Sequence, residues 1–175
     1  APSIDTPLHG LLPFKHIDHL HPDALIAVAA AENSEAITKA IWGDEMGWVP
    51  WQRPGFDLGL QLEKCLADNP KIRGIVLGSH GLFTWGDTSL ECYVNSLEVI
   101  EKASNYIEEK ISQNKVVFAG QKVKPLSDNQ RQQKASQLMP VLRGLCSSEN
   151  QMVGHFTDDD KVLSFINSYD LDRLA

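Results

Sequence analysis

The sequence of 175 residues lacks several features that mark large classes of proteins. Its longest apolar stretches, ALIAVAAA and GIVLG, are far too short to span a bilayer, which takes about 20 residues. It has no basic run of five or more residues and a net charge of −7, which argues against binding to nucleic acid or to an anionic membrane. The opening APSIDTPLHG lacks the charged start and apolar middle of a signal peptide.

Cysteine is also scarce, and the dinucleotide-binding pattern GxGxxG is absent. Cys65, Cys92 and Cys146 are widely spaced and form no CxxC pair, so we expect a reduced, cytosolic protein. Without GxGxxG, nothing in this stretch predicts a nicotinamide cofactor. Hydrophobic residues make up 42% of the chain, which is enough for a core, and the length favours one domain with a short appendage.

Strands and helices alternate along the sequence, which indicates the α/β class. Prolines and a glycine in residues 1–15 predict an irregular start. Short apolar segments bounded by turn residues predict strands over 16–21, 72–77 and 82–85, and the stretch MVGHF near the end predicts another.

The clearest predicted element is a helix from about Asp87 to Ser112. Thr88 and Glu91 form a capping-box pattern at its start. Apolar residues recur in it every three or four positions and predict the face that packs on the core. These residues are Leu90, Val94, Leu97, Ile100, Ile107 and Ile111.

Histidine is concentrated in HIDHLH, where a strand would turn His19 and His21 to one face and His16 to the other. Two residues of rise separate the Cβ atoms of His19 and His21 by roughly 7 Å, so both imidazoles can reach one cation. A third candidate, His80, lies in a glycine-flanked turn between two predicted strands. The alternative is that these are ordinary surface or core histidines.

Three aspartates lie close to these histidines in the sequence. Asp18 would face away from the histidine pair, and Asp23 lies in a first helical turn, where its charge favours the helix dipole. Asp5 belongs to the N-terminal loop, and catalytic groups are often found on loops.

The stretches PSIDTPLH, DHLHPDA and LGSHGLFTWG, the last before a long helix, resemble the class II aldolase family of zinc-dependent sugar-phosphate enzymes. The resemblance implies a three-layer α-β-α sandwich, here without its N-terminal part. It also implies one Zn²⁺ held by His19, His21 and His80.

The resemblance implies further roles in the stretch before the histidine pair. Asp5 matches the position of the family's catalytic glutamate, one methylene shorter, and would be the acid and base. Ser3 matches a serine that contacts the substrate phosphate, whereas Ile4 replaces a second such serine.

The strings HIDHLHPDALIA, GWVPWQRPGFDLGLQLEK and RGIVLGSHGLFTWGDT are most similar to the aldolase part of bifunctional rhamnulose-1-phosphate aldolase/alcohol dehydrogenases. This similarity implies an aldolase-like domain over 1–120 and, over 121–175, a connector toward a short-chain dehydrogenase that is absent here.

The implied activity is cleavage of a small sugar phosphate, rhamnulose 1-phosphate, to dihydroxyacetone phosphate and lactaldehyde. The alternatives are an epimerase or dehydratase on the same metal site, or a non-catalytic interaction domain like that of adducin. Relatives form rings of identical subunits, so we expect a homo-oligomer in the intact protein.

Overall fold

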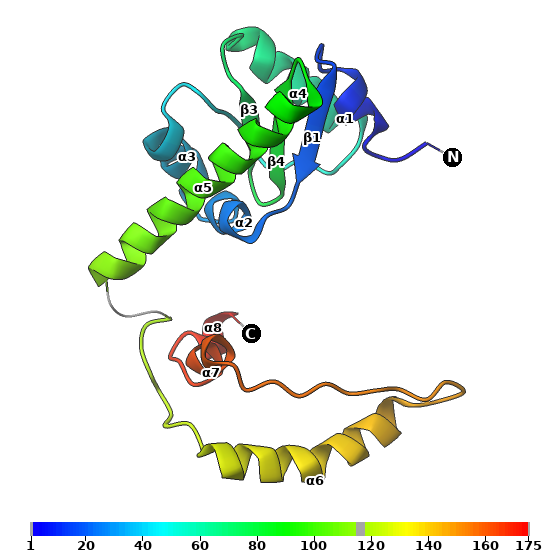
Figure 1. Ribbon diagram of the computed structural model, residues 1–175, viewed down its shortest axis with the longest axis vertical. Coiled ribbons are helices and arrows are strands. Elements are labelled where there is room, and N and C mark those ends of the chain that lie inside the picture. The colour runs from blue at the N-terminus through cyan, green and yellow to red at the C-terminus, as the bar shows by residue number, and fades with distance from the viewer. Residues whose placement is uncertain (1, 115–117, 175) are drawn as a thin grey trace. The chain divides into compact units, whose positions relative to one another are not determined.

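The computed structural model describes residues 2–114 and 118–174 and divides into two compact units, residues 1–110 and 111–175. The first unit is built around a four-stranded sheet (Figure 1). Its strands are β1 (His16–Leu20), β2 (Gly47–Val49), β3 (Gly74–Leu77) and β4 (Gly81–Gly86). They lie in the order β1-β4-β3-β2, with β4 antiparallel to both neighbours and β2 parallel to β3. Strands β1 and β2 therefore form the edges of this sheet.

Helices cover both faces of the sheet. Successive side chains of a strand point to opposite sides, so the apolar strand β3 contributes to a core on each face. The helices that begin in this unit are α1 (Thr6–Gly10), α2 (Asp23–Ala29), α3 (Ser34–Trp42), α4 (Phe56–Asp68) and α5 (Ser89–Asn114). Ile75 and Leu77 share a core with leucines of α1 and α4, whereas Val76 and Leu82 share one with α2, α3 and α5. The predicted three-layer α/β architecture is confirmed.

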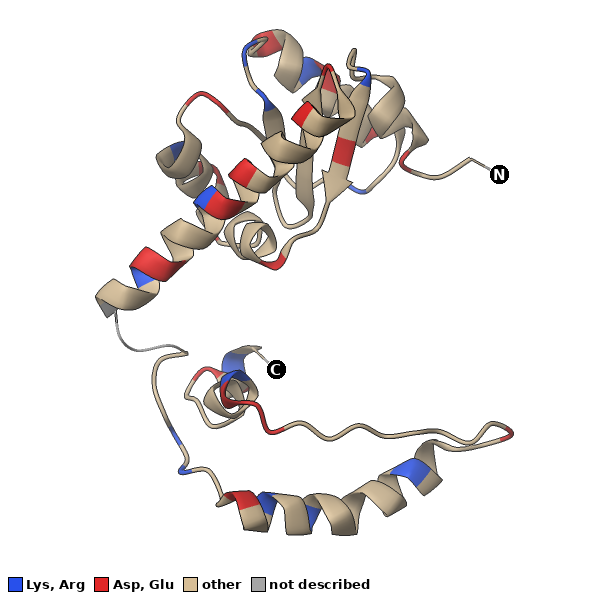
Figure 2. Ribbon diagram, in the orientation of Figure 1, with Lys and Arg blue, Asp and Glu red and all other residues tan. Residues whose placement is uncertain are grey.

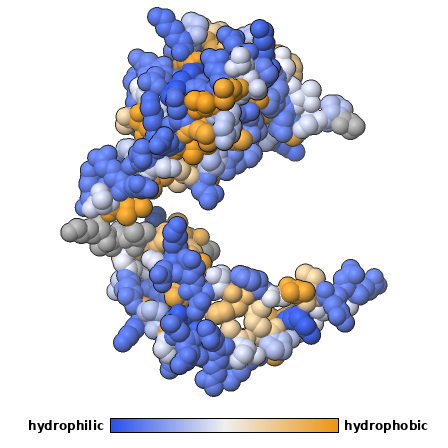
Figure 3. Space-filling model, viewed as in Figure 1, coloured by the Kyte–Doolittle hydropathy of each residue, from blue (hydrophilic) through white to orange (hydrophobic). Residues whose placement is uncertain are grey.

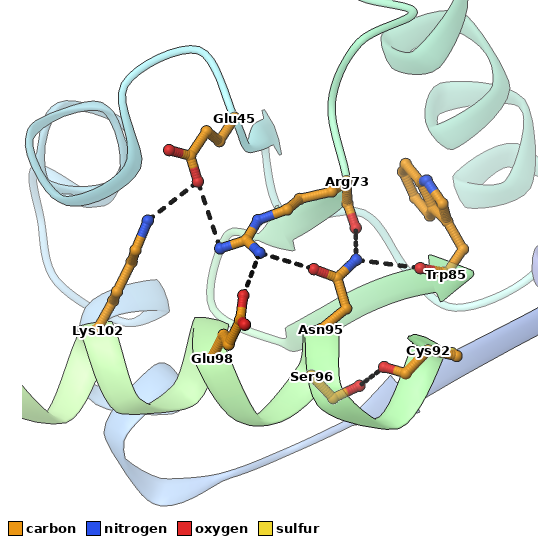
Figure 4. A network of polar contacts seen from close by, with 8 residues as sticks. All are labelled: Glu45, Arg73, Trp85, Cys92, Asn95, Ser96, Glu98 and Lys102. Atoms are coloured by element: carbon orange, nitrogen blue, oxygen red, sulfur yellow. Dashed lines mark hydrogen bonds and ion pairs between the residues drawn. The ribbon is translucent and has the colours of Figure 1, made fainter. Parts of the chain in front are cut away.

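A polar network fixes α5 to the end of the sheet where β3 begins and β4 ends (Figure 4). The Arg73 guanidinium donates to Asn95 Oδ1 at 2.9 Å and to Glu98 at 2.6 Å. The Asn95 amide donates in turn to the backbone carbonyls of Arg73 and Trp85, at 3.1 and 3.0 Å. These bonds satisfy carbonyls at the strand ends, and the turn between β3 and β4 lies at the other end of both strands.

The second unit contains α6 (Asp128–Cys146), α7 (Asp160–Ile166) and α8 (Leu171–Leu174). Ser127 and Gln130 form a capping box at the start of α6. A groove of about 350 Å³ lies between α6, α7 and the extended chain that joins them. Lys and Arg are scattered over both units (Figure 2). Within the described ranges, no helix is long and apolar enough to cross a membrane.

Three predictions about local structure differ from the structure, two of them only in part. Residues 1–15 contain the short helix α1, with Pro7 in its first turn, where proline leaves no backbone donor unpaired. The stretch MVGHF is not part of a strand. The Thr88–Glu91 box forms only in part: Thr88 accepts the Glu91 N–H at 3.1 Å, but the Glu91 carboxylate accepts from Asp87.

The packed face of α5 was predicted correctly only in part: Ile100 and Ile107 pack against the core. Leu90, Val94 and Leu97 are exposed, by 69%, 42% and 47%. The side chains that face the sheet are instead small or polar: Cys92, Ser96, Val99 and Ala103. Small side chains allow α5 to lie close to the strands, where the Ser96 hydroxyl bonds with Thr84 at 2.6 Å and with Asp18 at 2.9 Å. Over this part of the helix the larger apolar side chains of Leu90, Val94 and Leu97 point to solvent.

Candidate metal centre

Three histidines meet at one end of the sheet. His19 lies in β1 opposite Phe83 of β4, His21 follows the end of β1, and His80 lies in the turn between β3 and β4. Each offers a ring nitrogen, and these three atoms lie within 4.8 Å of one another. The ring of His19 is 4.5 Å from that of His21 and 5.1 Å from that of His80, between centroids. The structure thus brings the three predicted ligands together.

The turn that carries His80 is held by backbone hydrogen bonds. Ser79 has a φ of 55°, in the left-handed region that few non-glycine residues adopt. Its N–H donates to the carbonyl of Ala29 at 2.7 Å, and the His80 N–H donates to Leu77 at 3.0 Å. The end of α2 and the end of β3 therefore fix the backbone from which the His80 imidazole projects.

The ring of His19 is oriented by two contacts with β4. Its Nδ1 is 3.0 Å from the carbonyl oxygen of Leu82, which can only accept, so Nδ1 carries the proton. Its ring also stacks on Phe83, with 4.3 Å between centroids and planes 7° apart. In the neutral ring Nε2 then carries no proton, so its lone pair is available to bind a cation.

Burial favours the neutral form of two of the histidines. Desolvation lowers the pKa of His19 and of His80, and the neighbouring His21 adds to the effect in both. Asp5 acts in the opposite direction on both pKa values, which places its carboxylate near the cluster. A metal ion binds only unprotonated imidazole, so these rings need not lose a proton at neutral pH.

We therefore expect zinc affinity to change little between about pH 7.5 and 6.5 and to fall below that range. A lowered pKa means that His19 and His80 take up protons only below about pH 6.5, the ordinary imidazole value. The affinity then falls by up to about tenfold per pH unit for each protonated ring. Competition titrations with a chromophoric chelator at each pH would measure this. An affinity that still rises steeply above about pH 8 would indicate thiolate ligands instead.

The other predicted site residues lie at the start of α1. Asp5 occupies the N-cap position of this helix, although its side chain makes no capping hydrogen bond. Its backbone N–H donates to Ser3 Oγ at 3.2 Å. The Ser3 hydroxyl lies 3.4 Å from Asp5 Oδ2 and is exposed. His16 and Asp18 stay outside the cluster, because alternation along β1 turns them to the other face.

The donor set suits zinc. Imidazole nitrogens are common zinc ligands, and three of them leave one coordination position for a substrate oxygen or water, as in catalytic zinc sites. The fixed Nδ1–H of His19 is the outer contact that zinc-binding histidines usually make. The cluster of His19, His21 and His80 thus meets the requirements of a single zinc ion.

Sequence reasoning missed the residues that shape the cluster. Phe83 and the Leu82 carbonyl act on His19 across the β1–β4 pairing, and the pairing register cannot be read from either strand alone. The sequence signal for these contacts is GLFTWG, a predicted strand directly after the His80 turn, which contains both Leu82 and Phe83.

Comparison with known proteins agrees with this architecture. Residues 1–107 match the family model of the Class II Aldolase and Adducin N-terminal domain, and residues 133–175 match that of the Aldolase class II, second domain. Uncharacterized oxidoreductase YuxG from Bacillus subtilis (strain 168) is 41% identical over 174 residues, which are 99% of this chain and 25% of that protein. The chain thus spans a quarter of the length of this relative.

Two solved structures share the fold. The N-terminal class II aldolase domain of a conserved protein from Thermoplasma acidophilum is 35% identical, with a TM-score of 0.56 over 61% of this chain and 48% of that chain. YgbL from Klebsiella pneumoniae is 24% identical, with a TM-score of 0.50 over 61% of this chain and 57% of that chain, and shows the fold alone. Together with the family model over residues 1–107, these findings place the chain in the class II aldolase and adducin family.

Proposed function

We propose that this chain is the aldolase part of a zinc enzyme that cleaves a ketose 1-phosphate, namely rhamnulose 1-phosphate, to dihydroxyacetone phosphate and lactaldehyde. The observation that carries the proposal is the convergence of three histidine nitrogens within 4.8 Å, with Asp5 near them. The class II aldolase family supports the reaction class, and the similarity to rhamnulose-phosphate enzymes in HIDHLHPDALIA supports the substrate.

The residues supply what an aldol cleavage needs. The hydroxyl on C4 must lose a proton, and C3 must gain one after the electron pair of the C3–C4 bond moves to it. Bound zinc would act as a Lewis acid that draws electrons from the substrate oxygens. Asp5 would take the proton from the C4 hydroxyl and return one to C3, so that the enzyme ends unchanged.

Ser3 is the residue proposed to contact the phosphate. Its hydroxyl is exposed and lies next to Asp5 in the segment before α1, so one segment would hold both the phosphate and the proton carrier. A hydroxyl contributes a hydrogen bond without charge, so further donors are needed to bind a dianion.

The variant Asp5→Asn tests this assignment. We expect kcat for dihydroxyacetone phosphate release to fall by about 100-fold to 10,000-fold, the usual contribution of a general acid or base. Zinc content should not change, because Asp5 is not a ligand. Asp23→Asn is the matched control, since Asp23 is exposed at the start of α2. Release is measured by reducing the product with a coupled NADH-dependent dehydrogenase.

The same assay separates the alternatives. An epimer of the substrate, seen by NMR without dihydroxyacetone phosphate, would replace the aldolase by an epimerase. Loss of water would indicate a dehydratase. A zinc-loaded chain that leaves the substrate unchanged would favour the adducin-like interaction domain. The homo-oligomer, and a connector over 121–175 toward a dehydrogenase, stay predictions about the intact protein.

A further inference from the structure

A series of three aromatic rings joins helix α1 to the metal centre. The ring of His9 in α1 meets Phe83 of β4 edge to face, with 5.6 Å between centroids and planes 64° apart. Phe83 in turn stacks on His19 of β1, the contact already described at the cluster. Edge-to-face and stacked contacts are the arrangements in which aromatic rings attract each other. The three rings thus connect three separate elements of the fold.

These rings meet on one face of the sheet. Phe83 lies opposite His19 in the β1–β4 register, and opposed residues of antiparallel strands project to the same face. Leu8 of α1 belongs to the same core cluster as Phe83, so α1 packs on this face as well. Figure 3 shows hydrophobic side chains at the surface, but Phe83 is not among them, because it is fully buried. A ring enclosed in this way has little room to move between its two neighbours.

Asp5 and His9 lie on the same side of α1. Asp5 has helical backbone angles, and its carbonyl accepts a hydrogen bond from the His9 N–H at 3.1 Å. Residues four apart on a helix lie one above the other, about 5.4 Å along the axis. Desolvation lowers the pKa of His19 and of His80, and the Asp5 carboxylate opposes this in both. The side of α1 that carries His9 is therefore the side from which Asp5 acts on the cluster.

The other contacts of α1 hold it from a different direction. Leu8 is fully buried, and α4 comes close to α1 at Gly59, where an added Cβ would lie 3.2 Å from the Pro7 carbonyl oxygen. His9 follows Leu8 and projects about 100° from it around the helix axis. Two contacts from different directions fix the rotation of α1 about its axis, and this rotation decides where the Asp5 carboxylate points.

We propose that His9 and Phe83 are positioning residues, which set the place of the Asp5 carboxylate relative to the three-histidine centre through their ring contact. The inference rests on the proposed function, in which Asp5 carries the proton. Neither ring binds the metal or transfers a proton in this account. Because Phe83 contacts His19 and His9 at once, the same ring holds a ligand and the helix of the proton carrier in register.

The variant His9→Ala tests this role in catalysis. We expect kcat for dihydroxyacetone phosphate release to fall by about 10-fold to 100-fold, because a displacement of about 1 Å can cost that much. Zinc content should stay as in the parent. His9→Phe keeps a ring but cannot transfer a proton, and it should restore most of kcat. His16→Ala removes an exposed imidazole of the same unit and should leave kcat unchanged.

A second measurement needs no turnover. Co²⁺ bound in place of zinc shifts the NMR signals of nearby amide protons according to their distance and direction from the ion. We expect these shifts to change along α1 in His9→Ala, to stay unchanged along β3, and to return to the parent values in His9→Phe. Phe83→Leu should change the α1 shifts in the same way, and the double variant should add little, because both changes break one contact.

Each remaining outcome decides a separate question. Unchanged α1 shifts in His9→Ala, or a kcat as high as in the parent, would overturn the positioning role. A His9→Phe variant as slow as His9→Ala would overturn it too, because the imidazole itself would then act. If the parent gave cobalt shifts but cleaved no sugar phosphate, the proposed function would fail, while the shifts would still decide whether the rings hold α1. A parent without cobalt shifts would overturn the metal centre and this inference with it.

Discussion

Replacing His19 by alanine is expected to abolish stoichiometric zinc binding. His19 is the most enclosed of the three ligands: its ring contacts those of His21 and His80, and it stacks on Phe83. Its loss removes one of three donors and leaves the Leu82 carbonyl without its side-chain partner. The zinc affinity should fall by more than about 100-fold. That factor is the largest usual loss when only a hydrogen bond that orients a ligand is removed, and here the ligand itself is removed. Metal analysis after gel filtration and chelator competition would measure this.

His16→Ala is the matched control for this prediction. It removes an imidazole from the same strand, only three residues away, but His16 is exposed and lies outside the cluster. Zinc content and affinity should therefore stay as in the parent. If His19→Ala retained one zinc ion per chain, the ion would have to bind elsewhere, and the three-histidine centre would be wrong.

The candidate ligands could be predicted from the sequence because their spacing carries the geometry. Two residues of rise on a strand turn His19 and His21 to one side, and the glycines around His80 indicate a turn. Their meeting could not be predicted from spacing alone, because it depends on β1 pairing with β4 rather than with another strand. From the sequence alone, only the resemblance to a family connects the three histidines.

The orientation of α5 shows a second limit. Its apolar residues recur with a helical period, which normally marks the buried face. This holds for Ile100 and Ile107, which pack against the core. In the first half of α5 the buried face is instead set by hydrogen bonds and close approach, through Ser96 to Thr84 and Asp18 and through Asn95 to the strand ends. Periodicity predicts that a helix has an apolar side, but it does not predict what covers that side.

Replacing Gly81 by alanine is expected to weaken both the metal centre and the fold. An added Cβ would lie 2.6 Å from Cδ2 of His21 and 2.8 Å from the carbonyl oxygen of Leu20, distances that side chains essentially never show. The His21 ring is exposed and can turn away, but the carbonyl belongs to the backbone of β1. Alanine would therefore displace the end of β1 from the start of β4, and with it His21.

Both zinc affinity and stability should report this displacement. We expect the zinc affinity to fall by at least about tenfold. Displacing a ligand should weaken zinc binding at least as much as removing a hydrogen bond that orients a ligand. The free energy of unfolding without metal should fall by about 1–3 kcal/mol, the usual cost of inserting a methyl group into a packed site. Chelator competition and urea unfolding would measure the two quantities separately.

Gly10→Ala is the control, because a Cβ at Gly10 would meet no atom within 4 Å. Neither glycine has a positive φ, so alanine strains the backbone at neither position and the comparison isolates the steric contact. Gly10 ends α1, where alanine favours the helix slightly, and its variant should be as stable as the parent or more so. If Gly81→Ala bound zinc like the parent, His21 would be dispensable, and His19 and His80 would need another third ligand. The close approach of β1 to β4 is thus the part of the fold on which the centre depends most directly.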